Sequence, residues 1–202
     1  PSIQELADPI VLGRTGGVET SFHGAGREDI DVRMLGSGRP FVLEVTRPKK
    51  RFLDFESLTR EINVAARGFA EVHQLASTTR QAMISSKSAA ADKTYRAWIK
   101  FDREPPADVA AQLTGWRDVD IEQLSPQRVM KRRGVNTIRH KKVFDSAFID
   151  RDGDLFVWEV RASSGTYIKE LISGDDDRTK PSVSSRVGIS CHCEQLDVLA
   201  VH

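Results

Sequence analysis

The chain has 202 residues, of which 39% are hydrophobic and 29% charged, and its 30 Lys and Arg nearly balance its 29 Asp and Glu. This composition is typical of a soluble globular protein, and no run approaches the ~18 consecutive apolar residues of a membrane span. The two cysteines, Cys191 and Cys193, are too close for an unstrained disulfide. A disulfide-stabilised secreted fold is therefore excluded, and we expect a cytoplasmic protein. The chain starts at Pro1 without Met, as a piece of a longer protein does.

Apolar periodicity predicts strands and helices that do not alternate regularly along the chain. Residues 40–47 alternate as a strand does, and Asp54 is placed to cap a helix that runs to about Ala66 with Leu58 and Ile62 on its buried side. Further along, the predicted elements are strands at 69–76 and 93–102, a helix within 107–116 that Gly115 closes, a hairpin of 142–149 and 154–161 turning at Asp152-Gly153, a helix after 163–166 that Thr166 caps, and a terminal strand at 193–201. Because there is no βαβ rhythm, this order favours one α+β domain around a large mixed sheet.

Positive charge is segregated although the net charge is only +1. Residues 128–142 contain seven Lys or Arg and no carboxylate, and a second cluster lies at 47–51. A basic face of this kind suits phosphate groups. The alternative for residues 128–142 is a solvated loop that faces away from any ligand.

Two aspartates lie in the glycine-rich stretch GAGREDIDVR, in which Asp29 follows Arg27 and precedes Asp31 and Arg33. Glycines let the backbone turn tightly and approach a ligand, so an acid here can reach a substrate. Asp29 is a candidate nucleophile, and a plain ion pair with Arg27 or Arg33 is the alternative. Asp31 is the other candidate nucleophile.

Two further stretches carry residues suited to a nucleic-acid site. Tyr95 lies on the predicted strand KTYRAWIKFD, where a ring facing a ligand could stack on a base. Lys169 lies in the first turn of the helix in SSGTYIKELI, where a cation does not complement the helix dipole and so suggests another purpose. Packing and solvent exposure are the alternatives for these two side chains. Cys191-His192-Cys193 lacks the second ligand pair that zinc needs, so we expect no metal.

Together, these motifs resemble the catalytic motifs of the pseudouridine synthases. GREDIDVR is similar to the loop that carries the catalytic aspartate, KTYRAWI to the motif whose tyrosine meets the target base, and SSGTYIKEL to the stretch with a tyrosine and a basic residue. The longer strings AGREDIDVRMLGSGRPFVLEV, RASSGTYIKELISGDDDRTKPSVSS and CEQLDVL resemble the archaeal and eukaryotic tRNA pseudouridine synthases, the tenth Pus family. The basic string QRVMKRRGVNTIRHKK is similar to the loop that this family uses on tRNA.

The resemblance implies a fold, a reaction and a set of site residues. The fold is α+β, with a mixed, mostly antiparallel sheet, flanking helices and a central catalytic cleft. The reaction is isomerisation of uridine to pseudouridine in the TΨC arm of tRNA (positions 54 and 55), by a monomer without cofactor or membrane. The implied residues are Asp29 as nucleophile; Tyr95, Tyr167, Lys169 and Arg27 at the substrate; and Arg128, Lys131, Arg132, Arg133 and Arg139 on RNA. Because a cation favours the ionised form of a nearby carboxylate, we expect Lys169 to pair with Asp29.

Some alternatives stay open at this stage. There are two rival interpretations. The chain is a non-catalytic RNA-binding module, or it is a synthase for another uridine or another RNA. The THUMP-related N-terminal domain of the family is absent from these 202 residues, which we take as the catalytic domain. Whether catalysis passes through a covalent or a glycal intermediate is also open.

Overall fold

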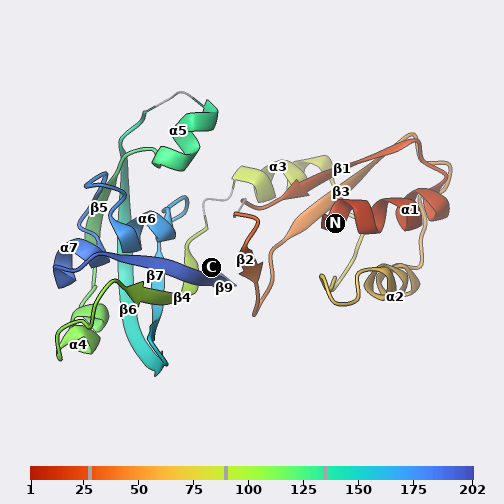
Figure 1. The fold of residues 1–202 in the computed structure, drawn as a ribbon. Helices are drawn as coiled ribbons and strands as arrows, with labels where there is room; N and C mark the ends of the chain where they lie inside the picture. Colours follow the sequence, from red (N-terminus) through yellow and green to blue (C-terminus); the bar gives the residue numbers. More distant parts are fainter. Residues whose placement is uncertain (27–28, 89–90, 134–135) are drawn as a thin grey trace. The chain divides into compact units, whose positions relative to one another are not determined.

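The computed structural model describes residues 1–26, 29–88, 91–133 and 136–202, with only the backbone at 85–88 and 131–133. The chain divides into two compact units. The smaller unit comprises residues 1–27 and 40–89, and the larger unit comprises 28–39 and 90–202. Both units are drawn in Figure 1.

The smaller unit packs helices against a two-stranded antiparallel sheet formed by β1 and β3. Its core comes from one face of the first two helices together with Val72, and Phe41, Leu43 and Val45 of the sheet pack against it. Spacings of three and four residues put the buried helical side chains on one stripe. The elements are α1 (Ile3–Thr15), β1 (Glu19–Gly24), β3 (Phe41–Thr46), α2 (Phe55–Ala65) and α3 (Arg80–Ser88).

Two predictions for this unit are confirmed and one is wrong. The strand β3 and the helix α2 form where expected, and Asp54 caps α2 by accepting a hydrogen bond from the Ser57 amide. Residues 70–79 form no strand. The reason is Asn63, whose amide side chain donates to the Val72 carbonyl and accepts from the Val72 amide, so these backbone groups are satisfied without a neighbouring strand.

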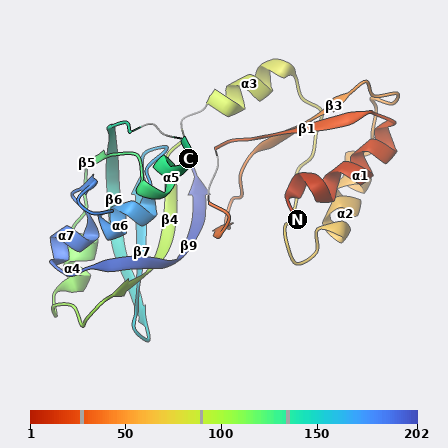
Figure 2. The same cartoon turned by 45° about the horizontal axis from the view of Figure 1, so that its top comes forward.

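The larger unit is built on a seven-stranded sheet in the order β2-β9-β4-β7-β6-β5-β8. Figures 1 and 2 both label its strands β4, β5, β6, β7 and β9. Only β2 and β9 pair in parallel among the pairs of this sheet that the described residues form, so the mixed, mostly antiparallel sheet expected from the sequence is confirmed. The strands are β2 (Val32–Met34), β4 (Lys93–Phe101), β5 (Val119–Gln123), β6 (Arg139–Asp152), β7 (Leu155–Ala162), β8 (Thr179–Lys180) and β9 (Cys191–Val201). The helices are α4 (Val109–Thr114), α5 (Gln127–Arg133), α6 (Ile168–Ser173) and α7 (Val183–Val187).

The core of this unit follows from the alternation predicted for its strands. On β4 the residues Tyr95, Ala97 and Ile99 are buried, and their neighbours between them are half-buried. The predicted β6–β7 hairpin turns at Gly153, whose φ of 63° suits a residue without Cβ. Trp158 of β7 is fully buried, and its indole N–H donates to the Leu113 carbonyl at the end of α4. The sheet is therefore fixed to its flanking helix by a hydrogen bond as well as by packing.

A short strand holds the segment that carries the two candidate acids. Residues Val32 to Met34 pair with Leu196 to Val198 of β9, and the Asp29 carbonyl accepts from the Val32 amide. The guanidinium of Arg33 donates to both carboxylate oxygens of Asp197 at 2.7 and 2.6 Å. Asp29 and Asp31 thus lie immediately before a strand that is anchored at a defined register.

The helix after residues 163–166 forms as predicted, but its cap differs. The helix α6 starts at Ile168 with Tyr167 at the N-cap position, where no side-chain capping bond is made. Thr166, which the sequence suggested as the cap, turns its hydroxyl back to the Ser163 carbonyl at 2.8 Å. The prediction of Thr166 as the cap is therefore wrong, because the hydroxyl completes the preceding turn instead.

Among the helices that the structure describes, none has both the length and the apolar character needed to cross a membrane.

Candidate active site

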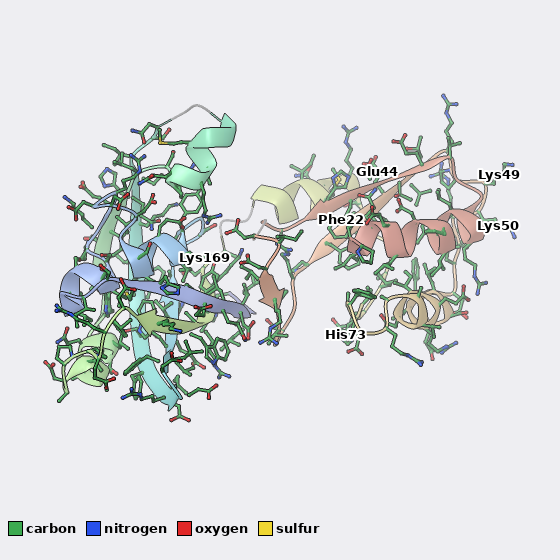
Figure 3. The ribbon with its side chains drawn as sticks, in the orientation of Figure 1. Phe22, Glu44, Lys49, Lys50, His73 and Lys169 are labelled. Carbon is green, nitrogen blue, oxygen red and sulfur yellow. The ribbon has the colours of Figure 1, made fainter. Side chains whose placement is uncertain are left out.

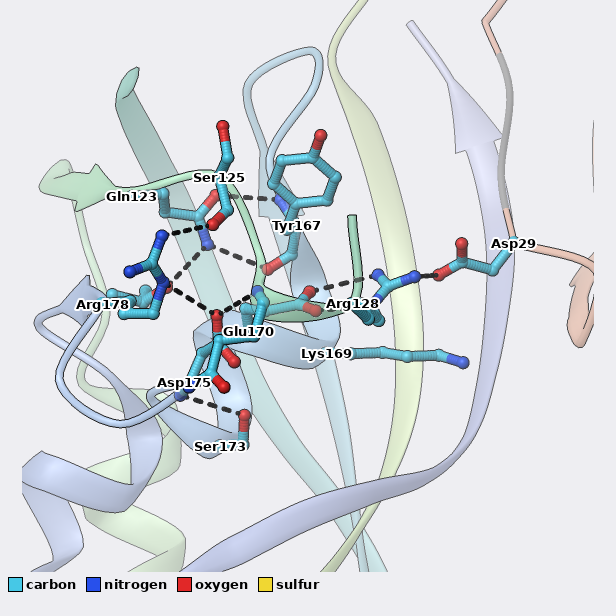
Figure 4. A network of polar contacts seen from close by, with 12 residues as sticks. Asp29, Gln123, Ser125, Arg128, Tyr167, Lys169, Glu170, Ser173, Asp175 and Arg178 are labelled. Carbon is cyan, nitrogen blue, oxygen red and sulfur yellow. Dashed lines mark hydrogen bonds and ion pairs between the residues drawn. The ribbon is translucent and has the colours of Figure 1, made fainter. Parts of the chain in front are cut away.

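Asp29 is held by an arginine. The Nη1 atom of Arg128 lies 2.7 Å from Oδ2 of Asp29 (Figure 4). Asp29 comes from the segment before β2, and Arg128 is the second residue of α5. About two fifths of each side chain is exposed, so the pair is accessible from solvent.

The same arginine also binds a second carboxylate. Its Nε donates to Oε1 of Glu170 at 2.6 Å, and its Nη2 donates to Oε2 at 3.3 Å. Glu170 lies on α6, and only 7% of its side chain is exposed. The hydrogen bonds that Arg128 donates to Glu170, more than its hydrogen bond to Asp29, raise the pKa of Arg128 above its ordinary value. Arg128 therefore stays charged and joins a buried carboxylate to a partly exposed one.

Lys169 binds Asp31 and not Asp29. Its Nζ atom donates to Oδ2 of Asp31 at 2.6 Å. This hydrogen bond is the main reason that the pKa of Asp31 lies below its ordinary value, and the charge of Arg128 adds to the effect. The expected pairing of Lys169 with Asp29 is wrong in this structure, because Asp29 takes its cation from α5.

The N-terminus of α5 is fixed by the acidic loop at 175–177. Asp175 accepts a hydrogen bond from the Gln127 amide at 3.0 Å, and Asp176 accepts from the Gln127 side chain at 2.7 Å. Arg178 continues this network by donating to the carbonyl of Ser125 and the side chain of Asn136. Ser125 and Asn136, on either side of α5 in the sequence, are thus both held by Arg178, and Figure 4 shows the bond to Ser125.

Tyr167 is placed by a buried amide. The fully buried side chain of Gln123 donates to the Tyr167 carbonyl and accepts from the Tyr167 amide, both at 2.9 Å. The guanidinium carbon of Arg139, at the start of β6, lies 5.3 Å from the centre of the Tyr167 ring. The structure therefore brings two of the predicted residues, Tyr167 and Arg139, into contact.

Tyr95 lies in the core of the larger unit, with 6% of its surface exposed. It pairs with Val160 of β7 and Val198 of β9, and Val198 in turn pairs with Met34 of β2. Tyr95, Val198 and Met34 thus form one cross-strand row, which ends on β2, the strand after Asp29 and Asp31. Its stacking on a base stays a prediction.

The remaining predicted residues are placed only in part. In the basic segment 128–142, residues 128–133 belong to α5 and 139–142 to β6, while 136–138 form neither helix nor strand. Arg27 lies outside the described residues, and so do the side chains of Lys131, Arg132 and Arg133. Their roles at substrate and RNA stay predictions.

Sequence reasoning missed Glu170, Gln123 and the acidic loop. The signal for Glu170 was a carboxylate within the apolar run of YIKELI, at a position that a helix in a core would bury. Gln123 had no comparable signal, because an amide at a strand end is ordinary. Within the described parts of the chain, no group of three or more His, Cys, Asp or Glu is arranged to hold a metal ion.

Residues 1–202 match the family model described as Pus10, C-terminal. The chain belongs to this family. It is 40% identical over 201 residues to the tRNA pseudouridine synthase Pus10 of Halorubrum lacusprofundi, an alignment covering 99% of this chain and 47% of that protein. It is 42% identical over 202 residues to the protein of the same name from Methanocaldococcus jannaschii, covering 100% of this chain and 44% of that protein. The family predicted from the sequence motifs is confirmed, and the chain spans about half the length of these relatives.

Solved structures agree with the fold of this chain. A chain in the crystal structure of a Cbf5-Nop10-Gar1 complex superposes with a TM-score of 0.59 at 17% identity, covering 100% of this chain and 45% of that chain. A chain of an archaeal box H/ACA sRNP Nop10-Cbf5 complex gives 0.52 at 17% identity, covering 100% and 44%. At this identity the likeness establishes the fold alone.

Proposed function

We propose that this chain is the catalytic part of a tRNA pseudouridine synthase that acts in the TΨC arm, with Asp29 as the catalytic carboxylate. The observation that carries the proposal is the place of Asp29 in a member of the Pus10 C-terminal family, directly before an anchored strand and ion-paired to Arg128. The names of the relatives support the reaction and the tRNA substrate.

The reaction needs a carboxylate and no oxidant. The bond between C1′ of the ribose and N1 of uracil breaks, the base turns, and a bond forms between C1′ and C5. The proton on C5 leaves, and N1 gains a proton, so atoms and electrons balance within the nucleoside. An ionised carboxylate can attack the sugar or the base, or assist departure of the base. The guanidinium of Arg128 lies 2.7 Å from the Asp29 carboxylate and places a positive charge beside it.

RNA binding rests on the basic segment. Arg139 stacks on Tyr167, which presents a cation and a ring together at the start of α6. A base can stack on a ring, and a phosphate can accept from a guanidinium that has N–H groups to spare. We therefore assign Tyr167 and Arg139 to the RNA surface.

The test is site mapping of pseudouridine in a tRNA transcript, with Asp29→Asn and Asp31→Asn as matched variants. We expect pseudouridine in the TΨC arm with the wild-type protein, none with Asp29→Asn, and product with Asp31→Asn. A transcript with cytidine at the target position is the control. Product with Asp29→Asn and none with Asp31→Asn would move the catalytic role to Asp31.

Two other outcomes would replace the proposal. Binding without any product, by a wild-type protein of full native length, indicates a non-catalytic RNA-binding module. Product only at uridines outside the TΨC arm indicates a synthase for another site.

A further inference from the structure

Arg128 was expected to bind an RNA phosphate, but its guanidinium is already occupied on two sides. One edge, Nε and Nη2, binds both oxygens of Glu170, and the outer Nη1 binds Asp29. A guanidinium has five N–H groups in a fixed fork, so it can hold two carboxylates at a fixed angle to each other. A guanidinium that one carboxylate holds in place therefore also fixes where the other carboxylate binds.

Glu170 is the fixed end of this chain of contacts. It is nearly buried on α6, where a charged group costs free energy unless it is paired and hydrogen-bonded. Arg128 is the cation that meets it. Because Asp29 is much more exposed than Glu170, the order of the side chains runs from the buried Glu170 outward to Asp29.

The backbone at Arg128 is held independently. The preceding residue, Gln127, binds Asp175 through its amide and Asp176 through its side chain. The acidic loop thus fixes the first turn of α5, from which the Arg128 side chain projects toward Asp29 (Figure 4). Both the backbone and the guanidinium of Arg128 are therefore placed before any RNA binds.

We propose that Arg128 is a positioning residue for the catalytic Asp29, held in place by Glu170, and not a phosphate ligand. The proposal rests on the assignment of Asp29 in the proposed function. Rotation of the Asp29 carboxylate away from the reacting atoms is what the bridge prevents, and a small misplacement of a catalytic group can lower a rate about 100-fold.

The experiment separates rate from affinity in the full native-length protein. Single-turnover pseudouridine formation at saturating tRNA, the Kd for tRNA and the salt dependence of Kd are measured for the wild type and for Arg128→Gln. We expect the rate to fall about 10- to 100-fold, with Kd within about twofold of wild type and an unchanged salt slope, because the number of neutralised phosphates stays the same. Arg151→Gln is the matched control for removing an arginine, since Arg151 lies at the far end of the β6–β7 hairpin and pairs with Glu104, and it should keep the wild-type rate.

Conservative variants distinguish a positioning role from a general loss of stability. Arg128→Lys keeps the charge but lacks the fork, so it should recover part of the rate lost in Arg128→Gln. Glu170→Gln should also lower the rate, and Glu170→Gln combined with Arg128→Gln should be no slower than Arg128→Gln alone, because the two residues act through one interaction. If Arg128→Gln does not fold, the single-turnover rate and Kd of Arg128→Lys and Glu170→Gln are used instead. A lower rate at a wild-type Kd in both variants supports the proposal, and a wild-type rate in both overturns it.

Two results would overturn the inference. An unchanged rate in Arg128→Gln, together with weaker binding and a salt slope lower by about 0.7 to 0.9, would make Arg128 a phosphate ligand after all. Additive losses in the double variant would show that Glu170 does not act through Arg128. An inactive wild-type protein overturns the proposed function and this inference together, whereas an active wild type with an active Arg128→Gln overturns this inference alone.

Discussion

Lys169 and Asp31 form an ion pair of 2.6 Å, while Asp29, two residues away, binds Arg128. One short segment before β2 therefore meets two cations from two helices, α6 and α5. The two aspartates thus have separate hydrogen-bonding partners. Asp31 thus fastens the segment to α6, and under the proposed function Asp29 is left for the chemical step.

The Asp31 pair should stabilise the fold at neutral pH and not in acid. Hydrogen bonding to Lys169 holds the pKa of Asp31 below its ordinary value of 3.8. A lowered pKa in the folded state contributes stability above the ordinary value, and that stability is lost as the pH falls through the folded pKa. Asp31→Asn should therefore lower the urea midpoint at pH 7 by a small amount, since the side chain is 62% exposed. The difference between the two midpoints should shrink as the pH falls below 3.8, and a constant difference across pH would contradict this origin.

Arg33→Ala should cost more stability than the removal of an exposed arginine. Asp197 is 1% exposed, and Arg33 supplies two hydrogen bonds to its carboxylate. Leaving a buried carboxylate without these bonds costs about 1–3 kcal/mol. Urea unfolding measures the change, with Arg60→Ala as control because Arg60 pairs with the exposed Glu56 on its own helix. Equal urea midpoints for the two variants would show that the pairing of Arg33 with Asp197 does not contribute to the free energy of unfolding.

The residues show which parts of this arrangement local sequence can predict. The strand β4, the helix α2 and the β6–β7 hairpin follow from periodicity and turn residues within a few positions, and all three were predicted. The strand expected at 69–76 failed because the Asn63 side chain, nine residues from Val72, satisfies its backbone. Lys169 pairs with Asp31 and not with Asp29. This pairing joins residues 138 positions apart and depends on the backbone conformation of the segment before β2. The Arg128–Glu170 pair spans 42 residues, and no local pattern encodes it.

The two cysteines should be unreactive in the folded protein. Burial raises the pKa of the Cys191 and Cys193 thiols from 9.0 to about 12. At pH 8 this lowers the reactive thiolate fraction by roughly a thousandfold. Iodoacetamide should modify neither thiol within the time that it modifies both in urea, as mass spectrometry would show. Cys191→Ala and Cys193→Ala assign any residual reaction, and rapid labelling of the native wild type would disprove the burial of these thiols.

A raised thiol pKa also predicts alkaline destabilisation. The folded state keeps protons that the unfolded state releases, so the contribution of the thiols to stability is complete below pH 9 and declines as the pH rises toward about 12. The urea midpoint of the wild type should therefore fall between pH 9 and pH 11 more than that of the variant with both cysteines changed to alanine. Parallel curves would assign the alkaline loss to other groups.

The loop after β3 should contribute to RNA binding without affecting the chemical step. Lys49 and Lys50 both donate their backbone amides to the Thr15 carbonyl at the end of α1, at 2.9 Å, and both side chains are exposed (Figure 3). The loop is therefore held in place while its charges face solvent, as binding to phosphate requires. Changing both lysines to alanine should weaken tRNA binding and lower the salt slope by about 0.7 to 0.9 for each phosphate that is no longer neutralised.

The single-turnover rate at saturating tRNA should stay at the wild-type value, because neither lysine belongs to the unit that carries Asp29. Arg60→Ala, which removes an exposed charge from α2, is the control for a general effect of net charge. A salt slope equal to that of the wild type, or to that of Arg60→Ala, would show that this loop does not bind RNA.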